Sequence, residues 1–172
     1  MSIMADQQFT FLVNGRPRPK QSARFVKGRV RSVVKTNPKL AHWDAAIKEA
    51  ALSAMAEAKS SDRWQPHTRE PLFLIMDFRL PIKDPSRQGY PHTNKPDADN
   101  LAKQVMDALE NIGCLKGGDQ FVARLEVTKT WCAYGDEGVT VTVQPVHDHA
   151  REMPYLNTND GDLGIPLNWL DD

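Results

Sequence analysis

Two carboxylates and an amine stand close together in the segment between residues 95 and 103. Asp97 and Asp99 are two residues apart at the expected start of a helix, and Lys103 follows Asp99 by one helical turn. Paired carboxylates suit a Mg²⁺ ion, and a neighbouring amine can stabilise charge that develops on a phosphate. Acids at a helix start also cap free N–H groups, and capping is the commoner role of such a pattern. The spacing alone leaves both interpretations open.

The composition indicates a globular protein of one ordinary domain. The chain has 172 residues, of which 40% are hydrophobic, enough for a buried core. No run approaches the roughly 20 apolar residues that a membrane helix needs, and the first residues lack the pattern of a secretory signal. Cys114 and Cys132 are the only cysteines and form no CxxC motif. We expect reduced thiols in a cytoplasmic protein, with a single disulfide as the alternative.

Charges of opposite sign are segregated along the chain, although 22 basic and 22 acidic residues give a net charge of zero. Between residues 16 and 35 there is no acid but there are eight bases: Arg16, Arg18, Lys20, Arg24, Lys27, Arg29, Arg31 and Lys35. From residue 148 to residue 172, acids predominate and Arg151 is the only lysine or arginine. Like charges repel each other, so the basic segment favours a polyanionic partner over a merely solvated hairpin.

Hydrophobic periodicity and turn residues predict the order of the elements. The predicted elements are a strand at 7–13, an exposed strand pair within 25–34, a helix from Pro38, a strand at 72–80, a loop at 81–96, a helix at 99–112, and strands at 121–131 and 139–146. This order predicts a single α+β domain whose mixed or antiparallel sheet packs against two main helices. Residues 147–172 lack periodicity, so we expect an acidic tail that is extended or partly disordered. Lys116-Gly117-Gly118 lacks the spacing of a phosphate-binding loop, so no nucleotide cofactor is expected.

The helix predicted at 99–112 has an apolar side and a polar side. Its polar side carries Asp99, Lys103, Asp107 and Glu110. An acid followed four residues later by a base is ordinarily a surface salt bridge worth about 0.3–0.5 kcal/mol. The basic segment and the long loop before Asp97 favour a metal site beside a DNA-binding surface instead.

At this point the chain resembles the RusA family of Holliday-junction resolvases, which is common in phages. The pattern Pro-Asp-x-Asp-Asn-Leu-x-Lys-x-x-x-Asp-Ala-Leu is present without a gap from Pro96 to Leu109. The opening from Gly15 to Arg24, the segment Asp119-Gln120-Phe121-Val122 and the later Lys129 resemble further blocks of the family. The likeness extends roughly from Phe9 to Val146.

The resemblance implies a RusA-like nuclease domain at 1–146, followed by the tail at 147–172. It implies a homodimeric, Mg²⁺-dependent endonuclease, with Mn²⁺ as a substitute, that resolves four-way or branched DNA by paired, symmetric cleavage in recombination and repair. Asp97, Asp99 and Lys103 match catalytic positions of the family, and Asp107 matches an acid that could support the metal site from its second shell. The residues expected to contact DNA phosphates are Arg16, Arg18, Lys20, Arg24, Arg29 and Arg31.

The sequence departs from the family at the third metal-binding carboxylate. The family carries an Asp pair where this chain has Gly117 and Gly118, and Asp119 falls on the next, variable position. A small shift of the glycine-rich loop would let Asp119 serve as the third metal ligand and catalytic carboxylate. The alternative is a catalytically weakened or inactive protein that binds branched DNA without cutting it.

Overall fold

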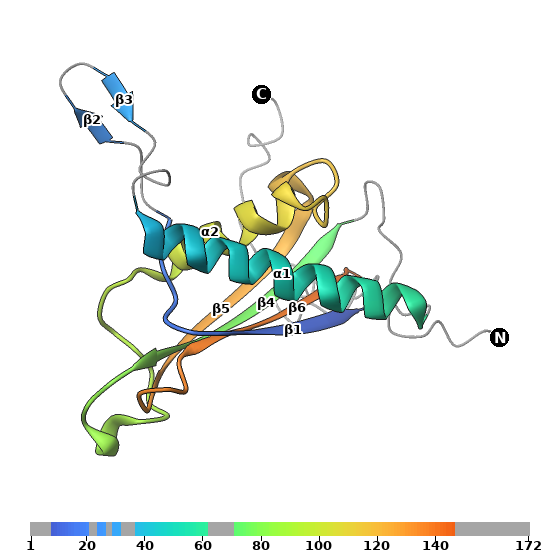
Figure 1. Ribbon diagram of the computed structural model, residues 1–172. Coiled ribbons are helices and arrows are strands. Elements are labelled where there is room, and N and C mark those ends of the chain that lie inside the picture. The colour runs from blue at the N-terminus through green and yellow to red at the C-terminus, as the bar shows by residue number, and fades with distance from the viewer. Residues whose placement is uncertain (1–7, 21–23, 27–28, 32–36, 62–70, 147–172) are drawn as a thin grey trace, which may run out of the picture.

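The computed structural model describes residues 8–20, 24–26, 29–31, 37–61 and 71–146, and its centre is a four-stranded sheet (Figure 1). The strands are β1 (Phe9–Asn14), β4 (Leu72–Pro81), β5 (Val122–Cys132) and β6 (Gly138–Pro145), in the spatial order β1-β6-β4-β5. β6 pairs antiparallel with β1 and β4, whereas β4 and β5 run parallel. The predicted α+β domain with a mixed sheet is therefore confirmed.

Helix α1 (Pro38–Ser60) begins where the sequence predicts it. The side chain of Asn37 accepts hydrogen bonds from the backbone N–H groups of Lys39, at 3.2 Å, and Leu40, at 3.3 Å. Pro38 occupies the first turn, where its missing N–H leaves no bond unmade. Cap and proline together fix the start of this helix.

Helix α2 (Ala98–Asn111) makes the crossover that a parallel pair of strands requires, from β4 to β5. Its apolar side packs on the sheet through Leu101, Val105 and Leu109, which are all fully buried. The opposite side of the helix faces solvent, as the periodicity predicts. The boundaries differ from the predicted 99–112 by one residue at each end.

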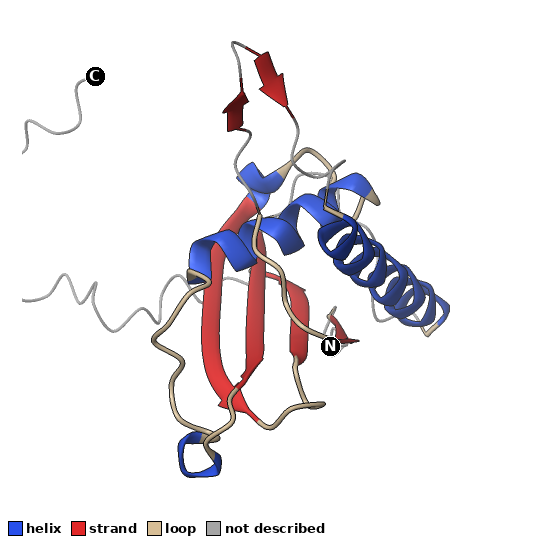
Figure 2. Ribbon diagram, turned by 60° about the vertical axis from the view of Figure 1, so that its left-hand side comes forward, coloured by secondary structure: helices blue, strands red, loops and turns tan. Residues whose placement is uncertain are grey.

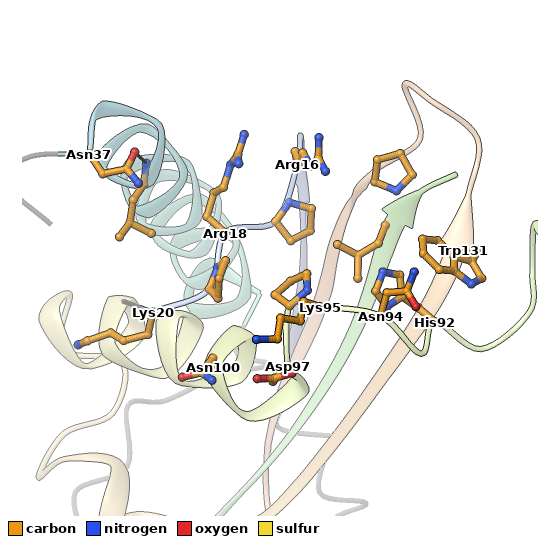
Figure 3. A pocket seen from close by; sticks show the side chains of 16 residues that line it. Arg16, Arg18, Lys20, Asn37, His92, Asn94, Lys95, Asp97, Asn100 and Trp131 are labelled. Carbon is orange, nitrogen blue, oxygen red and sulfur yellow. Dashed lines mark hydrogen bonds between the residues drawn. The ribbon is translucent and has the colours of Figure 1, made fainter. Parts of the chain in front are cut away.

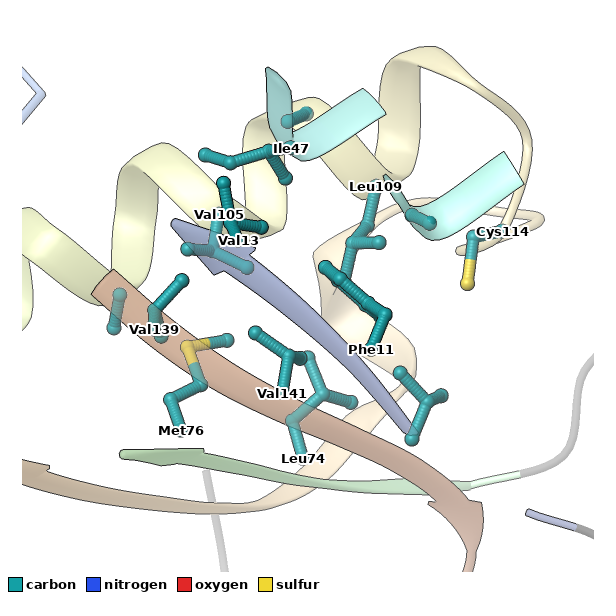
Figure 4. Packing of buried hydrophobic residues seen from close by; sticks show 14 of the residues in the cluster. Phe11, Val13, Ile47, Leu74, Met76, Val105, Leu109, Cys114, Val139 and Val141 are labelled. Carbon is teal, nitrogen blue, oxygen red and sulfur yellow. The ribbon is translucent and has the colours of Figure 1, made fainter. Parts of the chain in front are cut away.

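One continuous core lies between the helices and one face of the sheet (Figure 4). β1 buries alternate residues, as do β4 and the middle of β6, because successive side chains of a strand point to opposite faces. Trp43 of α1 is 3% exposed and belongs to this core. Cys114 and Cys132 are both buried and free, so the disulfide alternative is wrong. Burial raises the pKa of the Cys114 thiol to about 12.

The basic segment forms a small hairpin of its own. β2 (Arg24–Val26) and β3 (Arg29–Arg31) pair antiparallel, with Phe25 opposite Val30, which confirms the predicted strand pair. Figures 1 and 2 show this hairpin projecting beyond the sheet and the helices.

Two short 3₁₀ helices, η2 (Pro85–Arg87) and η3 (Asp119–Phe121), lie in the loops before and after α2. No helix in the described residues combines the length and apolarity needed to cross a membrane. The predicted acidic tail, at 147–172, lies outside the described residues.

Candidate active site and DNA-binding cleft

Asp97 and Asp99 lie at the N-terminal end of α2, and both are exposed. Asp97 is the N-cap residue by position, with φ −73° and ψ 146°, yet its side chain makes no capping hydrogen bond. Asp99 accepts one long bond, of 3.4 Å, from the side-chain amide of its neighbour Asn100. The carboxylate of Asp97 is therefore not used for capping. Two exposed carboxylates fit Mg²⁺, which typically takes one or two protein carboxylates and keeps several waters.

Lys103 is exposed one turn further along α2. No ion pair joins it to Asp99, so the ordinary surface salt bridge expected for this spacing is not formed between these two described residues. Its amino group has no acidic partner in the part of the chain that the structure describes, which leaves the charge available to a phosphate.

A cleft of about 930 Å³ lies beside Asp97. One side is formed by residues 16–20, here called the basic arm, and the other by the segment 92–97 that leads into α2 (Figure 3). The charged and polar side chains that line it are Arg16, Arg18, Lys20, Asn37, His92, Asn94, Lys95, Asp97 and Asn100. Cations outnumber the single carboxylate, so the cleft suits a phosphate backbone. Asp99 and Lys103 lie outside the lining, on the adjacent surface of α2.

Lys20 fastens the end of the basic arm to α2. Its backbone N–H donates to the carbonyl of Asn100 at 2.8 Å, and its amino group forms an ion pair with Asp107. Asp107, for which the sequence predicted a supporting role at the metal, therefore contacts the arm. Of the six bases predicted to contact DNA, Arg16, Arg18 and Lys20 line the cleft. Arg24, Arg29 and Arg31 lie on the hairpin strands β2 and β3.

The segment before Asp97 is attached to β5 by contacts that the sequence analysis did not assign. The amino group of Lys129 donates to the carbonyls of Asn94, at 3.1 Å, and Pro96, at 2.8 Å. The backbone N–H of His92 donates to the carbonyl of Lys129 at 2.8 Å. The sequence held two signals for Lys129, its resemblance to a family block and its place on the same face of the strand as Val127.

His92 is buried at the inner end of the cleft, 6% exposed, with its ring centroid 3.8 Å from that of Trp131. Burial lowers the pKa of the imidazole, and the nearby positive charge of Lys129 lowers it further. Its Nδ1 atom and the Nε1 atom of Trp131 are buried without a hydrogen-bond partner among the described residues. His92 was not among the predicted site residues, because a lone histidine in a loop carries no pattern.

Asp119 lies at the opposite end of α2 from Asp97. It follows Gly118, and a Cβ atom at Gly118 would be 3.5 Å from Oε1 of Glu110, in the last turn of the helix. At a rise of 1.5 Å per residue, Asp97 and Glu110 are about 20 Å apart along the helix axis. Within the described residues, no three His, Cys, Asp or Glu side chains come together to hold a metal ion. One chain thus places Asp97 and Asp99 at one end of α2 and Asp119 near the other.

The fold and the site define an α+β protein that presents paired carboxylates beside a basic cleft. The family model described as endodeoxyribonuclease RusA matches residues 14–144, and the chain belongs to this family. No curated protein matches the chain. Membership confirms the resemblance seen in the sequence and implies an endonuclease that resolves Holliday junctions.

Proposed function

We propose that this protein is a Mg²⁺-dependent endonuclease that cuts two opposed strands of a four-way DNA junction as a homodimer. The observation that carries the proposal is the free carboxylate of Asp97, next to Asp99 and at the edge of a cleft lined by arginines. A helix start that used its acids for capping would leave no ligands for a cation.

In this mechanism, Asp97 and Asp99 would hold the metal ion. Bound Mg²⁺ would lower the pKa of a water molecule and stabilise negative charge on phosphorus. Arg16 and Arg18 bind the backbone phosphates on either side of the scissile group, which positions it at the carboxylates. Lys103 acts as a fixed cation for the charge that develops on the phosphate. Water adds to phosphorus and gives up a proton to solvent, the bond from phosphorus to the leaving oxygen breaks, and that oxygen takes up a proton, so the cut strand ends in a phosphate on one side of the nick and a hydroxyl on the other.

The third carboxylate is proposed to come from a second copy of the chain. Asp119 is about a helix length from Asp97 in the same chain, whereas two α2 helices packed antiparallel would bring the N-terminal end of each near the C-terminal end of the other. A two-fold axis would generate both contacts at once and create two equal sites. Such a dimer matches the symmetry of a junction that is cut on opposed strands.

The proposal is tested by nicking of a four-way junction in Mg²⁺ and in Mn²⁺. Asp97→Asn and Asp99→Asn should abolish cleavage and keep or tighten junction binding, since a charge that repels phosphate is removed. Lys103→Ala should depress cleavage more than metal binding. Asp136→Asn, an exposed acid in the turn before β6, serves as the matched control. Normal cleavage by both Asn variants of the site would refute the assignment.

The composite site has a separate test by subunit mixing. Asp97→Asn and Asp119→Asn homodimers should each be inactive, but a mixed dimer contains one intact site, made of Asp97 and Asp99 from one subunit and Asp119 from the other. Nicking should therefore return after subunit exchange. If each site were built within one chain, both sites of the mixed dimer would be defective and the mixture would stay inactive.

The second candidate is a protein that binds branched DNA with weakened or no cleavage. It is favoured by Gly117 and Gly118 at the positions of the family's Asp pair and by the lack of a three-carboxylate group within the described part of one chain. Junction binding without nicking in either metal ion would support this candidate over the nuclease.

A further inference from the structure

Lys129 holds the segment that leads into Asp97 at three points. Its amino group donates to the carbonyls of Asn94 and Pro96, at 3.1 and 2.8 Å, and its own carbonyl accepts from the N–H of His92 at 2.8 Å. Pro96 immediately precedes Asp97 in the chain. The backbone of this segment is thus fixed to β5 just before the first carboxylate.

The position of Lys129 in the sheet is unusual for a lysine. It lies beside Phe78 of β4 in the parallel register, and Phe78 is fully buried on the helix-covered face. Lys129 itself is half-buried on the edge strand of the sheet, and a lysine that is drawn into a fold is normally paired. Here two backbone carbonyls accept from the amino group, and no ion pair with an acid is present among the described residues. Charge-assisted bonds of this kind are stronger than neutral ones, which favours a role in fixing the segment.

We propose that Lys129 is a positioning residue that preorganises Asp97, and through it Asp99, for a divalent cation. The inference rests on the proposed nuclease function. Lys129 does not line the cleft that Asp97 and Lys95 line, so it acts through the backbone of residues 94–96 without touching DNA. Groups that hydrogen-bond directly to metal ligands typically change metal affinity or activity by about 10-fold to 100-fold when removed, and Lys129 bonds the backbone one residue before the ligand, so we expect an effect at the lower end of this range.

The first test needs neither metal nor DNA. In Lys129→Met, which keeps the stem but loses the donors, amide hydrogen exchange at His92 and Leu101, whose N–H groups donate to the carbonyls of Lys129 and Asp97, should become faster in the metal-free protein. Exchange in β1 should be unchanged, because this strand lies at the opposite edge of the sheet from β5. Unchanged exchange at His92 and Leu101 would overturn the proposal even if the protein is a nuclease.

The second test is the metal requirement. Lys129→Met should raise the Mg²⁺ concentration for half-maximal nicking by about tenfold or more, with metal-free junction binding preserved. Lys129→Arg, which retains a charge and donors, should fall between the wild type and the Met variant. Lys83→Met, an exposed lysine after β4, is the matched control.

Lys129→Gln is used if the Met variant does not fold, because the glutamine side chain is polar but too short to reach both carbonyls. An unchanged metal requirement in a folded Met or Gln variant would overturn the proposal. Absence of nicking in the wild type would instead defeat the proposed function, and the exchange experiment would still decide whether Lys129 positions the segment.

Discussion

Lys20 of the basic arm forms an ion pair with Asp107, two turns along α2 from Asp99, and its backbone N–H donates to Asn100 on the same helix. The two side chains are 33% and 22% exposed, so water screens the pair only in part. The contact joins the arm that carries Arg16 and Arg18 to the helix that starts at Asp97. It therefore attaches the arm that forms one side of the cleft to the helix into which the other side leads.

Asp107→Asn should weaken junction binding by about twofold to fivefold, the effect of losing a partly exposed ion pair of up to about 1 kcal/mol. Removal of a negative charge by itself would strengthen binding to DNA. The direction of the change in affinity therefore shows whether Asp107 acts by positioning the arm or only through its charge. The measurement is a metal-free binding titration with a four-way junction. Tighter binding by the variant would show that the pair does not position the arm.

The arginines of the arm and Lys20 should differ in the salt dependence of binding. Arg16→Gln and Arg18→Gln should each reduce the slope of log affinity against log salt by about 0.9, the loss of one phosphate contact. Lys20→Gln should change the slope less, because its amino group is paired with Asp107. Binding of the junction at several salt concentrations measures the slopes. Equal changes for all three variants would assign Lys20 to phosphate as well.

Gly117 and Gly118, in the loop after α2, are neighbouring sites at which the effects of an alanine substitution can be compared. Their φ angles are +102° and +100°, so alanine at either position should cost about 1–3 kcal/mol of backbone strain. At Gly117 a Cβ would also lie 2.4 Å from Cε2 of Phe121, whereas at Gly118 its nearest neighbour is 3.5 Å away. Gly117→Ala should therefore lower the free energy of unfolding in urea more than Gly118→Ala. Phe121→Leu should recover part of the difference, and equal losses would contradict the steric argument.

Restoring the family's carboxylate at position 118 is complicated by Glu110. In Gly118→Asp the new side chain would begin 3.5 Å from the Glu110 carboxylate, and two adjacent carboxylates repel each other. Glu110→Gln with Gly118→Asp should be more stable to heat than Gly118→Asp alone. It should also nick junctions about tenfold faster than Glu110→Gln, the usual size of an effect at a metal site. No gain in nicking would show that the missing carboxylate does not limit the reaction.

His92 should make stability depend on pH. Burial and Lys129 hold the pKa of its imidazole below the usual 6.5, so the unfolded chain binds the proton more readily than the folded one. The stability advantage of the wild type over His92→Gln should therefore shrink as pH falls from about 7.5 to about 5.5. Urea unfolding across this range measures it, with His42→Gln on the exposed side of α1 as control. A constant difference would mean that His92 does not titrate between the two states.

The elements of this fold could be predicted because their signals are local. Asn37 and Pro38 mark the start of α1, and the apolar spacing from Leu101 to Leu109 defines the buried side of α2. The same spacing puts Asp99 and Lys103 on the exposed side. Each of these inferences uses residues within a few turns of one another, where the geometry of a helix is fixed.

The contacts that shape the candidate site could not be predicted in this way. Lys20 and Asp107 are 87 residues apart, and Lys129 is 33 residues from Pro96. The Lys129 contact depends on the parallel placement of β5 beside β4, and the Lys20 contact depends on the packing of the basic arm, which follows β1, against α2. No local pattern specifies either arrangement. The motif match likewise groups Asp119 with Asp97, because a motif records positions along the chain and not the distance between them in the fold.

Strand β5 starts directly after the 3₁₀ helix at Asp119 and reaches Lys129 seven residues later, beside the start of α2. Helix α2 and strand β5 are thus connected at both ends, by the covalent chain through Asp119 and by the hydrogen bond from Lys129 to Pro96. Two connections of this kind hold the distance between the ends of α2 constant. In the proposed dimer, the interval between the two nicks would accordingly be a fixed property of the enzyme, to which the junction arms must adjust.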